Sequence, residues 1–320
     1  MTLQVEVVIV DGGSSDNTAQ VVAEFSKRHE RIRYIKTTKP AAAPSNEGFD
    51  RDCNLAVELA QGTYCWLMTD DDLLIDDAVA NVVGQLDAEP ELVVGCVRIH
   101  DVDFTHVLVA QDPAVPEDSF YTAATWPRFV TDVAPHLTFV GRVIIRRSVW
   151  LSRDRERHFG TGFIHAGVIL SNPLASAVMV ASPLVALRYG NALWTSRAFD
   201  IWMFQWPDLI WATAGVTDAV KTSVTQRSPY KNLKCLLWYR ALGSYTIRSY
   251  RDRLAQASSF PYRIAALMIA CLPARLVNGF FWTRLISVRD REVATALHDL
   301  LHCGNAPPFV EHLARRRGIV

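Results

Sequence analysis

The first hundred residues alternate between short β-branched runs and longer segments whose apolar residues recur at helical spacing. The short runs predict strands at residues 5–10, 33–36, 64–68 and 92–97. The longer segments predict helices at residues 15–27, 54–60 and 76–86, the first of them capped by Ser14 or Ser15. Strands that alternate with helices are typical of an α/β domain with a mostly parallel, Rossmann-like sheet flanked by helices.

The pattern changes toward the C-terminus. Residues 138–145 and 177–181 still predict strands, whereas the chain from Trp194 onward reads as aromatic-rich helices and contains six of the nine tryptophans. We therefore expect an α/β domain over residues 1–190 and a helical, aromatic-rich and basic C-terminal region over residues 191–320, with a boundary near Asn191.

Charge is distributed unevenly although the formal net charge is zero. Residues 1–220 carry 17 Lys and Arg against 28 Asp and Glu, and residues 221–320 carry 16 against 5. The basic C-terminal region predicts an anionic partner, membrane lipid or nucleic acid. Nucleic acid is the less favoured of the two, because Arg315–Arg316–Arg317 is the only compact basic run in this region.

Several sequence features favour a cytoplasmic protein. The six cysteines are scattered without paired spacing, which is typical of reduced thiols and not of a disulfide framework or a zinc site. The first residues lack the basic segment and long apolar run of a signal peptide. The longest nearly apolar stretch, residues 260–286, is interrupted by Arg263, Pro273, Arg275, Asn278 and Arg284, so no apolar run reaches transmembrane length.

Two acidic features follow predicted strands. Asp11 with Gly12 and Gly13 ends the first strand, and Asp70–Asp71–Asp72 ends the strand at residues 64–68. Ligands of open α/β sheets bind beyond the carboxyl ends of strands, so both features could face one crevice. Carboxylate oxygens suit Mg²⁺ or Mn²⁺, which commonly bridge substrate phosphates.

Each acidic feature also has a purely structural interpretation, a turn that precedes a helix in one case and a solvated loop in the other. The chain lacks the GxxxxGK[ST] pattern of a P-loop and the GxGxxG pattern of a dinucleotide site. The two acidic features in order, each at the end of a strand, favour a metal-bound phosphate ester over either structural interpretation.

These motifs resemble glycosyltransferase family 2, the inverting nucleotide-sugar transferases with a GT-A fold. VVIVDGGSSDNT is similar to the family's second-strand motif, and RDCNLAVELAQGTYCWLMTDDDLL is similar to its helix, strand entry and acidic metal motif. The Cys-Trp-Leu run before three aspartates is most similar to abequosyltransferase-like members, which act on lipid-linked O-antigen precursors. The stretch TFVGRVIIRRSVW resembles the family's acceptor-side strand more weakly.

The resemblance implies a role for each acidic residue. Asp11, Gly12 and Gly13 would contact the nucleotide, Asp70 would lie against the sugar, and Asp71 and Asp72 would bind Mg²⁺ or Mn²⁺. The family often has Asp-x-Asp-Asp, and its first Asp falls here on Thr69, so which two of the three aspartates bind metal stays open. The metal would neutralise charge that develops on the leaving diphosphate.

Two departures from the family pattern concern the base and the N-terminus. The family's general base is commonly an acidic residue, but no carboxylate lies between Glu156 and Asp200, so His165 is the candidate base, with a structural, non-catalytic role as the alternative. The family also begins with a strand and helix that this chain lacks before residue 5. Because losing a central strand exposes a sheet edge, we expect the native gene product to be longer.

The resemblance and the pattern together predict an inverting, metal-dependent glycosyltransferase. It would move a sugar, a deoxyhexose among the candidates, from a nucleotide-diphosphate sugar to a saccharide hydroxyl on a lipid-linked surface-polysaccharide precursor. A peripheral position on the inner face of the plasma membrane follows if residues 260–286 lie on anionic lipid, the alternative being a helical pair packed on the α/β domain. The rival functions are a degenerate, non-catalytic binding module and a nucleotidyltransferase.

Overall fold

The computed structural model describes residues 5–37, 45–190, 197–256, 259–286 and 291–316. The chain forms two compact units. Unit 1 comprises Met1–Val97, Pro113–Val185 and Ala212–Val224, and unit 2 comprises Arg98–Asp112, Ala186–Trp211 and Thr225–Val320. The boundary predicted near Asn191 lies outside the described residues.

The strands form two sheets. A small parallel sheet pairs β1 (Val7–Asp11) with β2 (Ile32–Lys36), with Asp11 opposite Lys36. The larger, seven-stranded sheet has the order β3-β8-β5-β9-β4, with β6 paired to β5 and β7 to β9. Its strands are β3 (Tyr64–Trp66), β4 (Leu73–Leu74), β5 (Leu92–His100), β6 (Val107–Asp112), β7 (Ser119–Thr122), β8 (Val143–Arg146) and β9 (Ser176–Arg188).

The larger sheet is mixed and not mostly parallel. Strand β8 runs antiparallel to both of its neighbours, with Ile145 opposite Cys65 of β3 and opposite Leu92 of β5. Strand β7 runs antiparallel to β9 as well. The periodicity within single strands carried no signal for direction, which depends on the connections between the strands. The predicted α/β class with helices around a sheet and a helical C-terminal region is confirmed.

Apolar runs explain the core of unit 1. In β5 the residues Leu92, Val93 and Val94 are fully buried, as expected for a strand covered on both faces. Gly95 is required by close packing, because a Cβ there would lie 2.6 Å from the Leu184 side chain of β9. The helices of unit 1 are α1 (Thr18–Ser26), α2 (Ser45–Leu59), α3 (Ala78–Leu86), α4 (Trp126–Val133), α5 (Arg147–Ser152), α6 (Ile164–Leu170) and α9 (Asp218–Val224).

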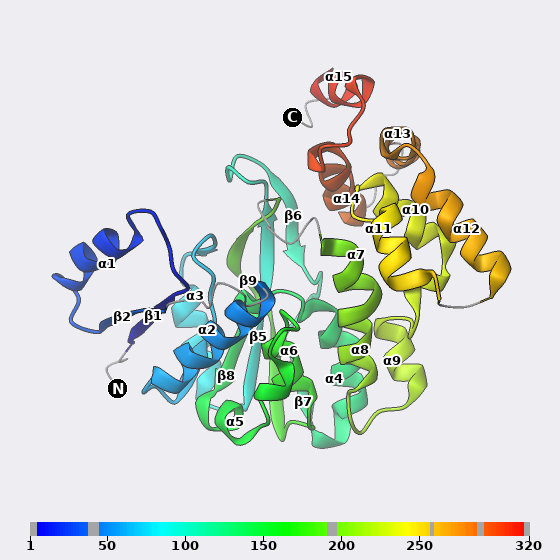
Figure 1. Cartoon of the computed structure of the whole chain (residues 1–320). Helices are drawn as coiled ribbons and strands as arrows, with labels where there is room; N and C mark the ends of the chain where they lie inside the picture. The colour runs from blue at the N-terminus through cyan, green and yellow to red at the C-terminus, as the bar shows by residue number, and fades with distance from the viewer. Residues whose placement is uncertain (1–4, 38–44, 191–196, 257–258, 287–290, 317–320) are drawn as a thin grey trace. The chain divides into compact units, whose positions relative to one another are not determined.

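Helices α2, α5 and α6 pack together in unit 1 (Figure 1). Trp150 of α5 is fully buried, and its indole N–H donates a hydrogen bond of 3.1 Å to the Asn54 side chain of α2. A buried indole needs such a partner, since an unpaired donor in the core is costly. Asn54 and Trp150 therefore fix α2 against the strand–helix corner that follows β8.

Unit 2 is built around aromatic and aliphatic residues on helices. Phe199, Leu236, Tyr245 and Leu254 share one buried cluster, and Trp282 is buried in a second. The helices are α7 (Ala198–Asp200), the π-helical segment Ile201–Gln205, α8 (Trp206–Trp211), α10 (Leu233–Ala241), α11 (Ile247–Ser249), the π-helical segment Tyr250–Leu254, α12 (Phe260–Cys271), α13 (Ala274–Leu285), α14 (Arg291–His302) and α15 (Pro308–Arg316).

Candidate functional site

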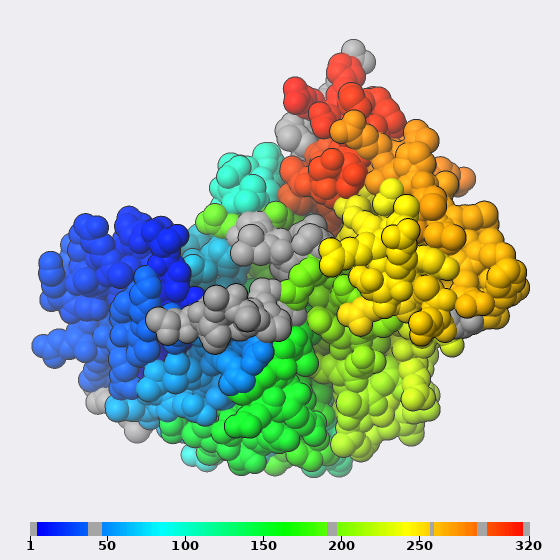
Figure 2. Space-filling model, in the orientation of Figure 1, coloured from blue at the N-terminus to red at the C-terminus, as the bar shows by residue number. Residues whose placement is uncertain are grey.

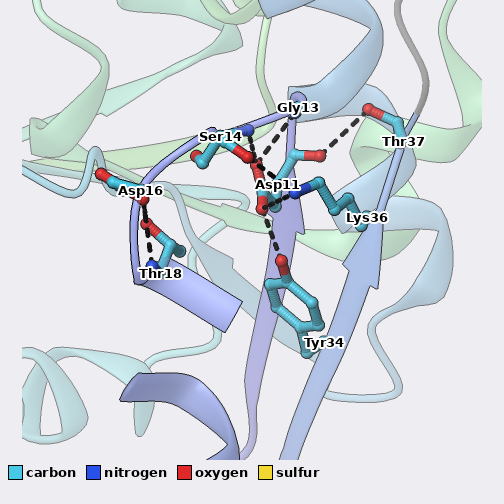
Figure 3. A network of polar contacts seen from close by, with 8 residues as sticks. All are labelled: Asp11, Gly13, Ser14, Asp16, Thr18, Tyr34, Lys36 and Thr37. Carbon is cyan, nitrogen blue, oxygen red and sulfur yellow. Dashed lines mark hydrogen bonds and ion pairs between the residues drawn. The ribbon is translucent and has the colours of Figure 1, made fainter. Parts of the chain in front are cut away.

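The turn after β1 is organised by the carboxylate of Asp11, which is only 5% exposed. Its Oδ1 accepts hydrogen bonds from the backbone N–H groups of Gly13 at 2.9 Å and Ser14 at 2.6 Å. Its Oδ2 accepts one from the Tyr34 hydroxyl of β2 at 2.5 Å (Figure 3). The turn also needs glycine at position 13, where φ is +102°. Asp11 therefore holds the loop through Oδ1 and connects it to β2 through Oδ2.

Strand β2 supports the same turn from the side (Figure 3). The Lys36 ammonium lies 3.9 Å from Oδ2 of Asp11 and donates a hydrogen bond of 2.6 Å to the Ser14 carbonyl. The Thr37 backbone N–H donates to the Asp11 carbonyl at 2.8 Å. The parallel register of β1 and β2 brings these groups to Asp11, because it places Lys36 directly opposite.

The hydrogen bonds at Asp11 shift two pKa values in opposite directions. The Ser14 backbone N–H and the Tyr34 hydroxyl hold the pKa of Asp11 well below its usual value, since they stabilise the charged form. The same hydrogen bond to Asp11 raises the pKa of Tyr34 to about 12. Asp11 is therefore ionised throughout the physiological pH range.

The first helix begins later than its predicted caps. Thr18 is its first residue, and Asp16 accepts a hydrogen bond of 3.0 Å from the Thr18 backbone N–H. The backbone N–H of Ser14, one of the two predicted caps, is instead bound by Asp11. The polar stretch after Asp11 is thus a loop before α1 and not the first turn of the helix.

The three aspartates Asp70, Asp71 and Asp72 occupy the turn between β3 and β4. Asp70 is exposed, and Asp71 and Asp72 are partly buried. The Thr69 hydroxyl donates a hydrogen bond to the Asp72 carboxylate, so the residue that departs from the family's acidic pattern orients one of the carboxylates. At the far side of the turn, the Ile75 backbone N–H bonds to the Leu184 carbonyl of β9 at 3.0 Å and anchors it.

A metal at this turn would need ligands from outside the protein in addition to the aspartates. Among the described residues, no group of three His, Cys, Asp or Glu side chains is arranged to hold a metal ion. Asp71 and Asp72 present hard oxygen ligands of the kind Mg²⁺ and Mn²⁺ accept, and Mg²⁺ usually completes its shell with water and substrate phosphate. The aspartates of this turn are therefore residues that could hold such a metal together with ligands from outside the protein.

His165 lies in the core, which contradicts its prediction as the general base. The side chain is 1% exposed, within a helix, α6, whose residues are all buried. Nε2 lies 2.8 Å from the Leu137 carbonyl, and burial lowers the pKa of His165 to about 4. A neutral ring that donates to a backbone carbonyl inside the protein is not placed to take a proton from an acceptor hydroxyl. The structural alternative for His165 describes it better.

Asp50 is a buried acidic residue that sequence reasoning missed. It lies on α2 and is fully buried, and its carboxylate accepts hydrogen bonds from the backbone N–H groups of Gly162 at 2.9 Å and Ile164 at 3.1 Å. Burial raises the pKa of Asp50 to about 6, although these N–H groups act in the opposite direction. Asp50 thus holds the loop of residues 160–164, within the stretch where the family commonly carries its general base.

A second contact from α2 reaches the same part of the chain. The Arg51 guanidinium lies over the Phe159 ring, 4.5 Å from its centroid. A cation over an aromatic face is attracted by the ring's negative potential. Asp50 and Arg51, consecutive on α2, therefore hold two neighbouring points of the segment that leads into α6.

Comparison with known proteins assigns residues 2–150 to the family described as glycosyl transferase family 2. The chain is 23% identical over 202 residues to the abequosyltransferase RfbV of Salmonella typhimurium, a match that covers 59% of each protein. It is 36% identical over 74 residues to a chondroitin synthase of Escherichia coli, covering 23% of this chain and 10% of that one. The chain thus matches less than two thirds of the length of either relative.

Two solved structures can be aligned with most of the chain. S. aureus TarS (residues 1–349) is 14% identical with a TM-score of 0.48, and the match covers 98% of this chain and 82% of that one. The mannosyltransferase PcManGT from Pyrobaculum calidifontis, solved with GDP-Man and Mn²⁺, is 15% identical with the same TM-score, and the match covers 93% and 76%. At these TM-scores the fold assignment depends on the strands and helices described above. Residues 2–150, which include both acidic turns, match the family model described as glycosyl transferase family 2.

Proposed function

We propose that the protein is an inverting glycosyltransferase that moves a sugar from a nucleotide-diphosphate donor to a saccharide hydroxyl. The observation that carries this proposal is the turn Asp70–Asp72, where β3 delivers three adjacent carboxylates to the edge of an α/β sheet. Adjacent carboxylates repel one another, and a cation shared with a diphosphate relieves that repulsion. The match of the same residues to the family 2 model supports this interpretation.

Each polar residue of the two turns has a part in this proposal. Asp71 and Asp72 would hold Mg²⁺ or Mn²⁺ against the diphosphate, and Asp70 would lie against the sugar. The metal, when bound, would stabilise the negative charge of the leaving nucleoside diphosphate. Asp11 would set the loop geometry through Gly13 and Ser14, so that its exposed backbone meets the nucleotide.

The acceptor and the cellular location extend the proposal. One matched relative is named an abequosyltransferase and another a chondroitin synthase, so both are named for work on saccharides. We infer a lipid-linked surface-polysaccharide precursor as acceptor, with a deoxyhexose among the candidate donor sugars. The excess of positive charge over residues 221–320 supports a cytoplasmic protein that is peripheral on the inner face of the plasma membrane.

A screen of nucleotide sugars tests the proposal directly. The purified chain is incubated with UDP-, GDP-, CDP- and dTDP-sugars, with Mn²⁺, Mg²⁺ or EDTA, and with a saccharide acceptor, and products are read by mass spectrometry and NMR. We expect one donor to give a product of inverted anomeric configuration that requires metal. Asp71→Asn should lower the rate at least about a hundredfold, since it removes charge from the metal site. Asp76 is an exposed aspartate just beyond β4, and Asp76→Asn should leave the rate unchanged.

The non-catalytic binding module is the second candidate, and the burial of His165 is the observation that favours it. A module of this kind would bind the nucleotide with metal but release no nucleoside diphosphate from any donor. Metal-dependent binding without turnover across the whole panel would overturn the transferase proposal in favour of the module.

A further inference from the structure

Helices α12 and α13 of unit 2 carry apolar residues on two opposite faces. The inner face is buried against α10 and α14 and includes Ala266, Ile269, Val277 and Trp282. The outer face exposes large side chains on both helices, with Phe260 at 66%, Met268 at 60%, Leu276 at 72% and Phe280 at 56% exposure. Ile264, Leu267 and Leu272 lie exposed in the same series, and both helices are at the surface of unit 2 in Figure 2 (orange).

Seven large apolar side chains in series need a partner. Scattered exposed apolar residues are ordinary, whereas a continuous series on one helix pair marks an interaction surface. Within the described chain no single helix is long and apolar enough to cross a bilayer, and the α12–α13 pair meets that criterion only when taken together across a 92° bend. Two twelve-residue helices at this angle are suited to lying in a surface.

Positive charge accompanies the outer face. The guanidinium of Arg263 lies over the Phe260 ring at 5.7 Å, and that of Arg284 lies over the Phe280 ring at 5.3 Å. Arg275 is exposed beside the bend, and residues 260–286 contain no Asp or Glu. Arg263 is half-buried and donates a hydrogen bond of 3.2 Å to the Ala255 carbonyl, whereas Arg275 and Arg284 are exposed. The two exposed arginines suit the boundary between lipid tails and anionic headgroups.

We propose that the outer face of α12 and α13 binds the surface of an anionic membrane, with its apolar side chains among the acyl chains and its arginines at the headgroups. A second copy of the chain is a poorer occupant, because face-to-face pairing of this surface would bring arginines together without an acidic partner in residues 260–286. The inference deepens the proposed function, since a lipid-linked acceptor would be met at such a surface, but it depends on different residues.

Flotation with lipid vesicles tests the proposal on the full chain without nucleotide or sugar. We expect the protein to float with phosphatidylglycerol-containing vesicles at low salt and to do so far less with pure phosphatidylcholine. The double variant Phe260→Glu/Phe280→Glu should lower the partition coefficient at least about tenfold, equivalent to about 1.4 kcal/mol. Arg275→Gln/Arg284→Gln should reduce the preference for anionic vesicles about fivefold per arginine.

A matched control exists on unit 1. Phe120 and Phe25 are 66% and 55% exposed, nearly equal to Phe260 and Phe280. Phe25→Glu/Phe120→Glu adds the same charges and removes the same rings, and we expect it to change flotation less than about twofold. Circular dichroism of each variant verifies that the helices remain folded.

Three outcomes would overturn the membrane assignment. The first is equal recovery of the wild type with neutral and anionic vesicles, and the second is an equal loss of flotation in the control variant. The third is self-association, seen by sedimentation velocity, that Phe260→Glu/Phe280→Glu abolishes while flotation is unchanged. Transfer to a soluble acceptor separates the proposals, because an active enzyme that does not float removes only the membrane assignment.

Discussion

The turn after β1 and the loop before α6 are each held by one buried carboxylate, yet the pKa values of these two carboxyl groups are shifted in opposite directions. Asp11 is held by two backbone N–H groups and a tyrosine hydroxyl, which lower its pKa. Asp50, on α2, also accepts hydrogen bonds from two backbone N–H groups, but burial dominates and raises its pKa to about 6. Similar hydrogen bonding therefore gives a permanently charged anchor in one region and a titrating anchor in the other.

The difference shows how depth decides the effect of a hydrogen-bonded carboxylate. Hydrogen bonds favour the charged form and desolvation opposes it, so their balance sets the pKa. At Asp11, near the mouth of a turn, the hydrogen bonds dominate. At Asp50, inside unit 1, the backbone donors do not offset desolvation. The two anchors should therefore respond differently to mutation and to pH.

The largest expected effect is on Asp50. Asp50→Ala leaves the N–H groups of Gly162 and Ile164 without their acceptor inside the protein, at about 1–3 kcal/mol each. We expect the free energy of unfolding at pH 5, measured by urea titration, to fall by about 4 kcal/mol. Asp118→Ala is the control, because Asp118 accepts one backbone N–H, from Ala181 at 2.8 Å, at a half-buried site, and should cost about 1 kcal/mol. Equal losses of unfolding free energy in both variants would contradict the larger cost that we attribute to the burial of Asp50.

The next effect is the pH dependence of stability. Because the pKa of Asp50 is raised in the folded state, its contribution is full below about pH 4 and is lost as pH rises through about 6. The shift of about two units corresponds to about 3 kcal/mol between pH 4 and 7. Asp50→Asn should remove this slope when urea titrations are repeated across the range. If Asp50→Asn keeps the wild-type dependence of the unfolding free energy on pH, that dependence arises from another titrating group.

The smallest effect concerns Asp11, whose lowered pKa contributes stability above about pH 4 that is lost as pH falls. Tyr34→Phe removes one donor and should raise the pKa of Asp11 by less than about one unit, measured by NMR titration of its carboxyl carbon. Tyr64→Phe, which removes a hydroxyl bonded to the Pro90 carbonyl at 2.7 Å, should leave the pKa of Asp11 unchanged. An unshifted Asp11 in Tyr34→Phe would show that the backbone N–H groups alone set its pKa.

Local pattern predicted most elements of unit 1 but not their pairing. The apolar run beginning at Leu92 and the strand at Tyr64 were found at their first residues, because burial on both faces leaves a continuous apolar signal. The first half of α2 and strand β7 of unit 1 were missed, as was β6 of unit 2, since their residues are mostly polar or exposed. The antiparallel direction of β8 depends on long connections that no short window contains.

The residues of the candidate site also differ in whether the sequence alone could predict them. The turns at Asp11 and Asp70–Asp72 were predictable, because each contains its whole motif within a few residues. Asp50 was not, since its partner Gly162 lies 112 positions further along the chain. The error at His165 had a visible signal, namely the apolar residues on both sides of it in FIHAGVIL, which indicate a buried helix.

The central claim is that the Asp70–Asp72 turn binds a metal together with a diphosphate, and calorimetry with nucleoside diphosphates tests it most directly. We expect the wild-type chain to bind one nucleoside diphosphate only when Mn²⁺ is present, Asp71→Asn to weaken that binding at least about tenfold, and Asp76→Asn to leave it unchanged. Binding that is independent of Mn²⁺, or equal in wild type and Asp71→Asn, would contradict the claim.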